Sequence, residues 1–373
     1  MDALMLPLNW QRVRLGDIGK PCMCKRVMKH QTTRYGEIPF YKIGTFGNTA
    51  DAFISKKLFL EYKTKYSFPK KGDILISASG TIGRAVVYDG KPAYFQDSNI
   101  VWIDNDETLV KNDFLFYAYS NVKWNTEHTT ILRLYNDNFR NTLIPLPPLN
   151  EQSAIANILS ALDRYLCALD ALILKKEGVK KALSFELLSQ RKRLKGFNQA
   201  WQKVRLGDIA NYLISNLSAE QITQQGKIKV YDVNNFIGYT DTTFISDKPY
   251  ISIVKDGSVG RVRILPPKTN ILSTMGALIA NHRTTTEFLF YLLSNFDFKN
   301  FTSGSIIPHI YFKDYKEKTI FLPPLNEQSA IANILSALDN EIASLKNKKR
   351  QFENIKKALN HDLMSAKIRV LEK

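Results

Sequence analysis

Cysteine and histidine are scarce in this chain. Its 373 residues include three cysteines, Cys22, Cys24 and Cys167, and five histidines. A structural zinc site takes four ligands at defined spacing, and no second cysteine pair or close histidine pair completes such a set around Cys22 and Cys24. The sequence therefore predicts no metal site. It predicts reduced thiols, as expected in a cytoplasm.

Long hydrophobic runs are also absent. No apolar run approaches the ~18–20 residues that a membrane-spanning helix needs. The first ten residues, MDALMLPLNW, show no basic segment followed by a long apolar one, so they do not resemble a secretory signal. We expect a cytoplasmic protein without a membrane partner.

Acidic residues are few relative to basic ones. The chain has 52 Lys and Arg against 35 Asp and Glu, which gives a net charge of +17 and a pI near 9.5. Such a balance favours a polyanionic partner, because each phosphate contact made by Lys or Arg releases condensed counterions. The alternative is a generally basic surface that binds nucleic acid only non-specifically.

Catalytic motifs are missing as well. The chain contains no Asp/Asn-Pro-Pro-Tyr/Phe motif and no glycine-rich phosphate loop, and the stretch Gly80-Thr81-Ile82-Gly83 is too short for one. The sequence therefore predicts no catalytic residue and no cofactor in this chain. A self-contained methyltransferase or nuclease with weak motifs is the alternative, and a purified chain that methylated or cut DNA alone would favour it.

The chain does contain a long internal repeat. Residues 146–163 have the sequence LPPLNEQSAIANILSALD, and residues 322–339 have the same eighteen letters. A second pair opens each half: WQRVRLGDI begins at Trp10 and WQKVRLGDI at Trp201. Repeats of this kind indicate repeated structural units. The protein is thus two units in tandem, each a globular part followed by a helical part.

The helical parts carry apolar residues at a 4-3-4-3 spacing. This spacing is typical of a coiled-coil seam, and its members are Ile155, Leu159, Leu162, Leu166, Leu169 and Ile173, then Ile331, Leu335, Leu338, Ile342, Leu345 and Phe352. Asn150 is the predicted N-cap, and the first helix is predicted to run to about Lys195, before Gly196. A homodimer zipper is possible in principle, but two equal helices in one chain can pair with each other.

The globular parts share a plan and differ in detail. Each is predicted to be an α+β domain with a glycine-bounded turn after a strand, at Gly80 and at Gly257, and with a short helix, around 114–121 and 288–295. By alignment, residues 96–99 correspond to 273–276, and residues 42–44 correspond to 232–234. The helical parts agree even at polar positions, so one explanation is that they meet the same partner twice while the globular parts recognise two ligands. A recent duplication whose helices have not yet diverged is the alternative.

These motifs resemble type I restriction specificity subunits. The resemblance is carried by LPPLNEQ at the start of a long helix, by the Trp-x-x-Val-Arg-Leu-Gly-Asp-Ile opening, by Gly-Thr-Ile-Gly after Gly-Asp-Ile-Leu-Ile-Ser, and by the segment that runs from Ser303 to Pro308. It implies an α+β fold in which two similar target-recognition domains are joined by two long helices. These helices would form an intramolecular antiparallel coiled coil with pseudo-twofold symmetry. The expected domains are 1–145 (recognition), 146–196 (helical), 197–321 (recognition) and 322–373 (helical).

The resemblance also implies a function without catalysis. Each recognition domain would bind one half of a bipartite site in double-stranded DNA, and the coiled coil would set the gap between the half-sites. The helical regions would recruit two methyltransferase subunits, which bind S-adenosylmethionine. A motor–nuclease subunit would join where cleavage occurs. An adaptor that uses the same scaffold without sequence preference is a further alternative.

Candidate binding residues are polar side chains on predicted loops that differ between the two units. For DNA these are Arg34, Lys42, Thr45, Thr81, Arg84, Gln96 and Asn99 in the first domain, and Asp232, Asn234, Ser258, Arg261, Ser305 and His309 in the second. For the partner subunit they are Asn150, Glu151, Gln152, Asn326, Glu327 and Gln328. The alternative for the last six is that they dock against the protein's own recognition domains.

Overall fold

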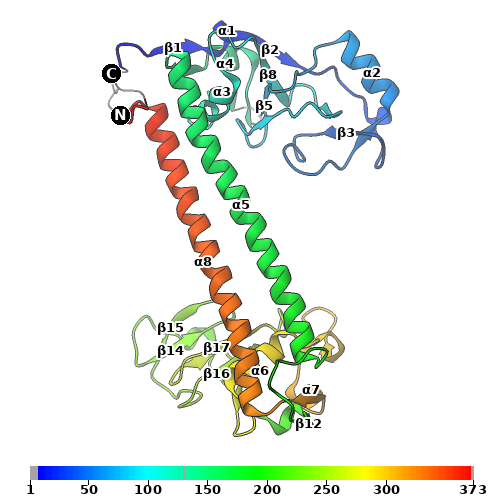
Figure 1. Cartoon of the computed structure of the whole chain (residues 1–373), viewed down its shortest axis with the longest axis vertical. Coiled ribbons are helices and arrows are strands. Elements are labelled where there is room, and N and C mark those ends of the chain that lie inside the picture. The colour runs from blue at the N-terminus through cyan, green and yellow to red at the C-terminus, as the bar shows by residue number, and fades with distance from the viewer. Residues whose placement is uncertain (1–6, 126, 129–131, 371–373) are drawn as a thin grey trace. The chain divides into compact units, whose positions relative to one another are not determined.

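The computed structural model describes residues 7–125, 127–128 and 132–370, so the predicted outer ends of the first and last domains, 1–6 and 371–373, lie outside the described residues. The chain divides into two compact units (Figure 1). Unit 1 comprises residues up to Leu169 together with those from Lys348 onward, and unit 2 comprises residues 170–347. Each unit therefore holds one globular part and portions of both helical parts.

Unit 1 is built on a four-stranded antiparallel sheet in the order β2 (Gly19–Met23), β8 (Ile100–Asn105), β5 (Ile74–Ser77), β6 (Ala85–Val87). Successive side chains of a strand point to opposite faces, and β5 and β8 are apolar on both. Ile74 and Ile76 pack with helix α3 (Asn112–Tyr119), whereas Leu75 joins Trp102 in a second core. The sheet is therefore covered on both faces.

A smaller sheet and several short elements complete unit 1. The small sheet has the order β4 (Phe53–Ile54), β3 (Ile38–Tyr41), β7 (Tyr94–Phe95), with β3 and β7 parallel. Helix α2 (Lys56–Lys65) follows β4, and Ser55 caps it by accepting a hydrogen bond from Leu58 N at 3.2 Å. The other elements are β1 (Gln11–Arg14) paired with β11 (Leu143–Leu146), β9 (Glu127–His128) paired with β10 (Leu132–Arg133), α1 (Leu15–Ile18) and α4 (Asn136–Asn141).

Unit 2 repeats this plan strand for strand. Its large sheet is β13 (Ala210–Ile214), β19 (Met275–Ala280), β16 (Tyr250–Val254), β17 (Val262–Leu265), and its small sheet is β15 (Phe236–Thr240), β14 (Ile228–Tyr231), β18 (Asn270–Ile271). The remaining elements are β12 (Gln202–Arg205) paired with β22 (Thr319–Leu322), β20 (Thr302–Ser303) paired with β21 (His309–Ile310), α6 (Thr286–Ser294) and α7 (Phe312–Tyr315). The prediction of two similar α+β domains is confirmed.

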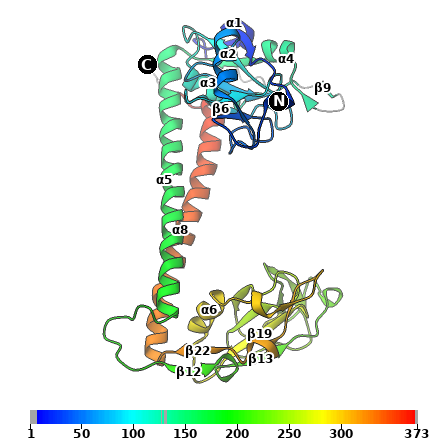
Figure 2. The ribbon, with the colours of Figure 1, turned by 90° about the vertical axis from the view of Figure 1, so that its right-hand side faces the viewer.

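The two units also differ. In unit 1, α2 connects the small sheet to the large one, whereas residues 241–249, all described, contain no helix in unit 2. The predicted short helices are confirmed with slightly earlier starts, as α3 and α6. Figure 2 shows α6 between the long helices and the strands of unit 2, where Phe288 and Leu289 are fully buried in the core.

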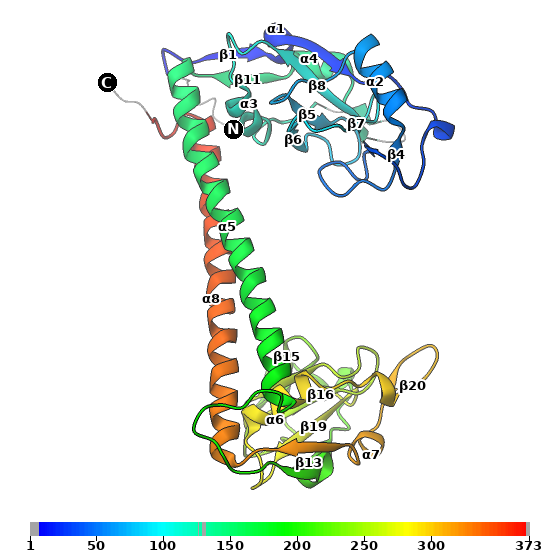
Figure 3. The same ribbon diagram turned by 45° about the vertical axis from the view of Figure 1, so that its right-hand side comes forward.

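Two long helices, α5 (Leu149–Leu188) and α8 (Leu325–Met364), each of 40 residues, contribute to both units. In unit 1, Asp163 pairs with Lys356 and the ring of Tyr165 lies 4.7 Å from that of Phe352. The order is reversed between the two helices, so their segments run antiparallel, side by side (Figure 3). The predicted seam positions are buried or half-buried, which confirms the coiled coil.

Both predicted ends of the first helix were misplaced. Helix α5 begins at Leu149, because Pro148 O accepts the first backbone bond, from Gln152 N at 2.9 Å. Asn150, the predicted N-cap, therefore lies inside the first turn. The helix ends at Leu188 rather than near Lys195, because Gln190 takes a left-handed conformation with φ 61°. Helix α8 ends in the same way, with Ala366 at φ 56°.

Candidate nucleic-acid interface

A glycine turn (residues 80–83) follows strand β5 in unit 1. Gly80 and Gly83 have φ of 66° and 82°, a region that glycine adopts without steric cost. A Cβ on Gly83 would stand 2.0 Å from Trp124 Nε1, so the turn packs directly on that ring. Ser77 holds the turn from inside, since its Oγ donates to Thr81 O and accepts from Arg84 N. Thr81 itself is exposed at the turn.

Unit 2 has the same turn at residues 257–260. Gly257 and Gly260 have φ of 84° and 80°, and a Cβ on Gly260 would lie 2.6 Å from Phe298. Gly260 N donates to Val254 O, as Gly83 N donates to Ser77 O. Ser258 is exposed at its tip. The two glycine turns are thus equivalent structures over different aromatic rings.

The arginine after each glycine turn reaches the loop that follows the first strand of the small sheet. Arg84 Nη2 lies 3.4 Å from both Gly47 O and Asn48 Oδ1 in unit 1. Arg261 Nη2 donates to Asn234 Oδ1 at 2.9 Å in unit 2. Arg84 and Arg261, both predicted to bind DNA, therefore also connect two loops of their own domains.

The loop after β3 is fixed by side chains that the sequence analysis assigned to DNA. Thr45 Oγ1 accepts from Lys42 N at 3.1 Å, and Gln96 Oε1 accepts from Ile43 N at 2.9 Å. Lys42 Nζ pairs with Asp51 at 2.9 Å. In unit 2 the corresponding loop turns on Asp232, whose Oδ1 accepts from Asn234 N and Asn235 N at 2.8 and 2.6 Å. These side chains shape the loops that carry them.

A cleft of 490 Å³ beside this loop gathers positive charge in unit 1; we call it the basic cleft. Three predicted residues line it, Lys42, Gln96 and Asn99. Arg26, Lys29 and Arg133 line it too, whereas Arg34 is exposed and is not among the lining residues. Cations concentrated in a concave surface favour phosphate or base edges as ligands. Asp97 is the acidic residue of the lining, and it pairs with Arg26 at 2.9 Å.

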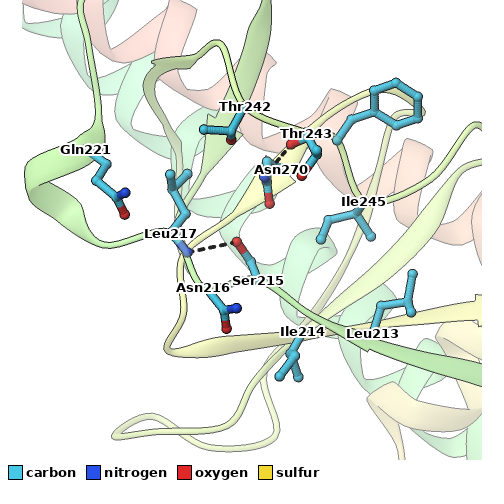
Figure 4. A pocket seen from close by; sticks show the side chains of 11 residues that line it. Leu213, Ile214, Ser215, Asn216, Leu217, Gln221, Thr242, Thr243, Ile245 and Asn270 are labelled. Atoms are coloured by element: carbon cyan, nitrogen blue, oxygen red, sulfur yellow. Dashed lines mark hydrogen bonds between the residues drawn. The ribbon is translucent and has the colours of Figure 1, made fainter.

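Unit 2 holds a pocket of 330 Å³ at a different place (Figure 4), since Asp232, Thr274 and His309, the counterparts of Lys42, Asn99 and Arg133, do not line it. Its side chains are aliphatic, aromatic or uncharged polar ones, such as Leu213, Asn216 and Thr242. Asn270 donates to Thr243 O at 2.6 Å and is thereby held in the pocket wall. None of the six DNA-binding residues predicted for unit 2 lines this pocket.

A two-stranded hairpin lies next to the glycine turn in each unit. In unit 2 an isolated bridge joins Asp256 to His309, and Ile310 N donates to Lys255 O at 2.9 Å. In unit 1 the bridge joins Ser79 to Arg133, and Leu134 N donates to Ala78 O at 2.8 Å. Ser305 is exposed at the tip of the unit 2 hairpin, which projects at the edge of the unit near the label β20 in Figure 3.

Several of these residues were not predicted from the sequence. Arg133 occupies the place in its unit that His309 occupies in unit 2, and the repeat offset of 176 residues already related the two. Arg26 and Lys29 belong to a basic stretch after strand β2, a signal that was available. The alignment of 96–99 with 273–276 was wrong: Asn99 O accepts from Ala78 N as Thr274 O accepts from Lys255 N, so Asn99 corresponds to Thr274. The segment from Lys255 to Thr274 is shorter than the segment from Ala78 to Asn99, which shifted the alignment.

Glu151 and Glu327 lie at the helix junctions, where each long helix begins against the globular part of its unit. Glu151, 2% exposed, accepts from Trp10 Nε1 at 3.0 Å and from Arg369 Nε at 2.7 Å. Glu327, 0% exposed, accepts from Trp201 Nε1 at 2.9 Å and from Arg193 Nη2 at 2.6 Å. The repeated Trp and Glu of the sequence motifs therefore meet inside each unit.

Gln152 and Gln328 complete these junctions. Gln152 accepts from Lys111 N at 2.8 Å and donates to Pro147 O at 2.8 Å. Gln328 accepts from Thr285 N at 3.0 Å and donates to Pro323 O at 2.8 Å. Of the six residues predicted to bind a partner, the four Glu and Gln side chains are thus buried against their own domains, and Asn150 and Asn326 are exposed.

A third repeated contact lies further along each helix. Tyr117 Oη donates to Asp163 at 2.7 Å, and Lys356 pairs with the same carboxylate. In unit 2, Tyr291 Oη donates to Asp339 at 2.9 Å, and Lys180 pairs with it. Burial, and then the neighbouring aspartate, raises the pKa of both tyrosine hydroxyls well above the usual value. Both phenols are therefore neutral donors at physiological pH.

The opposite face of each helix start is exposed and identical in the two units. It presents Leu149, Asn150, Ser153, Asn157 and Ile158 in α5, and Leu325, Asn326, Ser329, Asn333 and Ile334 in α8; we call these the repeated helix faces. Leu149 and Leu325 are 41% and 47% exposed, and Ile158 and Ile334 are also exposed. Core packing does not require identity at exposed positions.

The described residues contain no group of three or more His, Cys, Asp or Glu suited to hold a metal ion. Within the same part of the chain, the helices lack the combination of length and apolar character that crossing a bilayer requires.

Comparisons with known proteins point to one family. Residues 7–176 and 198–354 match the family model described as the type I restriction modification DNA specificity domain. A proposed type I restriction enzyme specificity subunit of Haemophilus influenzae is 63% identical over 148 residues, which cover 39% of this chain and 38% of that protein. The MjaVIII specificity subunit of Methanocaldococcus jannaschii is 25% identical over 414 residues, covering 99% of this chain and 95% of that protein.

Solved structures show the same fold. The type I restriction–modification S subunit from M. genitalium has a TM-score of 0.63 at 20% identity, with 96% of this chain and 98% of that chain covered. A chain from a study of complex assembly and conformational transition of the type I R-M system has a TM-score of 0.59 at 17% identity, with the same coverage.

Proposed function

Because the chain belongs to the type I restriction–modification DNA specificity family, we propose that it recognises a bipartite DNA sequence on behalf of methyltransferase subunits. Each unit would bind one half-site, and the long helices would set the number of base pairs between the half-sites. One observation supports this proposal most strongly. The helix junctions and helix faces are identical in the two units, while the loops around the two glycine turns differ.

Catalysis is not part of the proposal. Specificity subunits of type I systems are non-catalytic, and this chain belongs to their family, so it is not an enzyme on its own. Methylation of adenine, and cleavage where a motor–nuclease subunit is present, would be carried out by partners. S-adenosylmethionine would bind to the methyltransferase subunit rather than to this chain.

Charge and shape support DNA as the ligand of unit 1. The basic cleft brings Arg26, Lys29, Lys42 and Arg133 together with the amide side chains of Gln96 and Asn99. Lysine and arginine contacts to phosphate set register, whereas amide and guanidinium groups can distinguish base edges in the major groove. The same cleft thus offers both kinds of contact.

The presence of two equivalent exposed surfaces favours the binding of two methyltransferase subunits. The repeated helix faces expose the same two aliphatic and three polar side chains in each unit. Exposed apolar residues rimmed by polar ones are typical of protein interfaces. Asn150 and Asn326, predicted from the sequence, belong to these faces, whereas the buried Glu and Gln would support the helix from within.

The direct test is a genome-wide map of methylated adenine in a host that carries a matching methyltransferase subunit, with and without this chain. A bipartite motif that appears only with the chain is the expected result, and it would give both half-sites and the gap. No new motif, with the partner present and active, would contradict the proposal and favour an adaptor that lacks sequence preference.

Partner recruitment has its own test. Ile158→Asp and Ile334→Asp each place a charge on one helix face, so each variant is expected to co-purify with about half as much methyltransferase, and the double variant with none. Ile355→Asp is the matched control, since Ile355 is an exposed isoleucine of α8 outside these faces. Undiminished co-purification of the double variant would contradict recruitment through these faces.

A further inference from the structure

The bridge between the hairpin and the glycine turn places one side chain at the same backbone position in each unit. That side chain is Arg133 in unit 1 and His309 in unit 2, opposite Ser79 and Asp256 respectively. Both are half-buried, in hairpins that are attached to the turn by the equivalent backbone bonds already described. The scaffold is therefore constant, while the chemistry of the side chain changes.

The hydrogen-bond partners around the two side chains also differ. In unit 2, His309 Nδ1 lies 2.7 Å from Asp256 Oδ1, and the ring stacks on Tyr311 at 6.5 Å and 21°. In unit 1 the bridge partner, Ser79, donates instead to Asn99 Oδ1 at 2.7 Å. Arg133 lines the basic cleft beside Asn99. The backbone at this position is therefore equivalent in the two units, but the hydrogen-bond donors and acceptors of its side chains are different.

The hydrogen-bonding capacity of each side chain follows from its chemistry. A guanidinium only donates, and its usual partner in the major groove is guanine, which presents O6 and N7 as acceptors. An ionised carboxylate only accepts, so His309 Nδ1 must donate to Asp256, and in the neutral ring Nε2 keeps its lone pair. That nitrogen can accept from an exocyclic amine, which is N6 of adenine or N4 of cytosine.

We infer that this bridge position determines base specificity: Arg133 selects a guanine in one half-site, and His309, positioned by Asp256, selects an adenine or cytosine amine in the other. The inference rests on the proposed function, because it specifies which side chains distinguish the bases. His309 was a candidate from the sequence, whereas Arg133 and Asp256 are identified by the bridges. Asp256 acts through His309 and is a positioning residue.

The experiment selects sequences from randomised double-stranded DNA with the full chain in complex with its methyltransferase subunit. His309→Ala is expected to weaken base preference on the order of tenfold at one position of one half-site and to leave the other half-site unchanged. Arg133→Ala is expected to do the same in the other half-site. His309→Arg is expected to change the preference at its position toward guanine.

Asp256 is tested by a loss and a rescue. Asp256→Ala is expected to relax the same base position as His309→Ala, whereas Asp256→Asn retains an oxygen that accepts from Nδ1 and is expected to restore the preference. A merely structural role would lower affinity for every sequence without changing the preferred base. The matched control is Glu317→Ala, which removes an exposed ion pair with Arg205 in the same unit.

The outcomes separate the two proposals. If the wild-type complex selects a bipartite sequence and these variants keep every base preference, the bridge position is only scaffold and the inference is overturned, while the proposed function stands. A uniform loss of affinity in the variants would overturn it equally. If the wild-type complex selects no sequence at all, the proposed function itself fails.

Discussion

The helix junctions and the loops around the glycine turns lie in the same units. The junctions make the same contacts in both units, whereas the loops carry different side chains. Trp10, Glu151 and Gln152 have counterparts in Trp201, Glu327 and Gln328 that make the same hydrogen bonds. Around the glycine turns the backbone is shared, whereas Arg133 is replaced by His309 and Ser79 by Asp256. Buried polar networks tolerate little change because each lost partner leaves another group unsatisfied. At the bridge position Ser79 is buried and the other three side chains are half-buried, and each unit has its own hydrogen-bonded pair there, Ser79 with Asn99 and His309 with Asp256.

The largest expected effect is at the helix junctions. Glu151→Ala leaves the buried indole N–H of Trp10 unpaired and should lower the free energy of unfolding by about 3 kcal/mol, and Glu327→Ala should do the same through Trp201. Urea unfolding measures both. Asn157→Ala, on the exposed face, should change the value by less than about 0.5 kcal/mol. Unequal losses for the two glutamates would break the equivalence of the junctions.

The glycine turns come next. Gly83→Ala combines a positive φ with a Cβ placed 2.0 Å from Trp124, so we expect a loss of more than about 1 kcal/mol and weakened DNA binding. Gly260→Ala should cost less, because its Cβ would lie 2.6 Å from Phe298. Thermal unfolding and DNA binding are the measurements.

Gly178→Ala is the control for both turn variants. Gly178 lies inside α5 with nothing within 4 Å of an added Cβ, so alanine there should stabilise the protein by about 0.5–1 kcal/mol. If all three alanines had similar effects, the close packing of the turns on their aromatic rings would be unsupported.

The tyrosine–aspartate contacts should give a smaller, matched pair of effects. Tyr117→Phe and Tyr291→Phe each remove a hydroxyl that donates to an aspartate, at an expected cost of about 1 kcal/mol in unfolding free energy. Chemical denaturation of the two variants in parallel gives the values. A cost in only one of them would show that the repeated contact stabilises one unit alone.

The smallest expected effect compares the basic cleft of unit 1 with the uncharged pocket of unit 2. Lys29→Ala in the basic cleft should reduce the slope of log binding constant against log salt concentration by about 1, as expected for one lost phosphate contact. Gln221→Ala, in the uncharged pocket of unit 2, should leave the slope unchanged. Equal slopes for the two variants would contradict a phosphate contact that is made by the basic cleft and not by the uncharged pocket.

Much of the fold could be predicted because its signals are local or repeated. The 4-3-4-3 spacing from Ile155 onward identified the coiled coil, and the repeat identified two equivalent units. The end of α5 could not be predicted in this way, since Gly196 was the obvious stop and Gln190 takes the left-handed conformation instead. A single residue with positive φ leaves little trace in the sequence.

The candidate site was harder to predict, because its residues meet through long-range contacts. Because Glu151 recurs as Glu327 in the second repeat, it was predicted to bind a partner subunit. Its buried contact is instead with Trp10, 141 residues away in the chain. Of the seven residues predicted for the first domain, the structure brings three, Lys42, Gln96 and Asn99, into one cleft. That cleft also depends on Arg26 and Arg133, which the loop-by-loop comparison did not select.

The most direct test of the central claim exchanges one recognition domain for a copy of the other while both long helices are kept. A chain in which residues 197–321 are replaced by a copy of the first recognition domain should direct adenine methylation to a motif whose two half-sites are inverted copies of each other. The gap between the half-sites should stay as in the wild type. A methylation map that retained the original second half-site would contradict the claim that each unit recognises its own half-site.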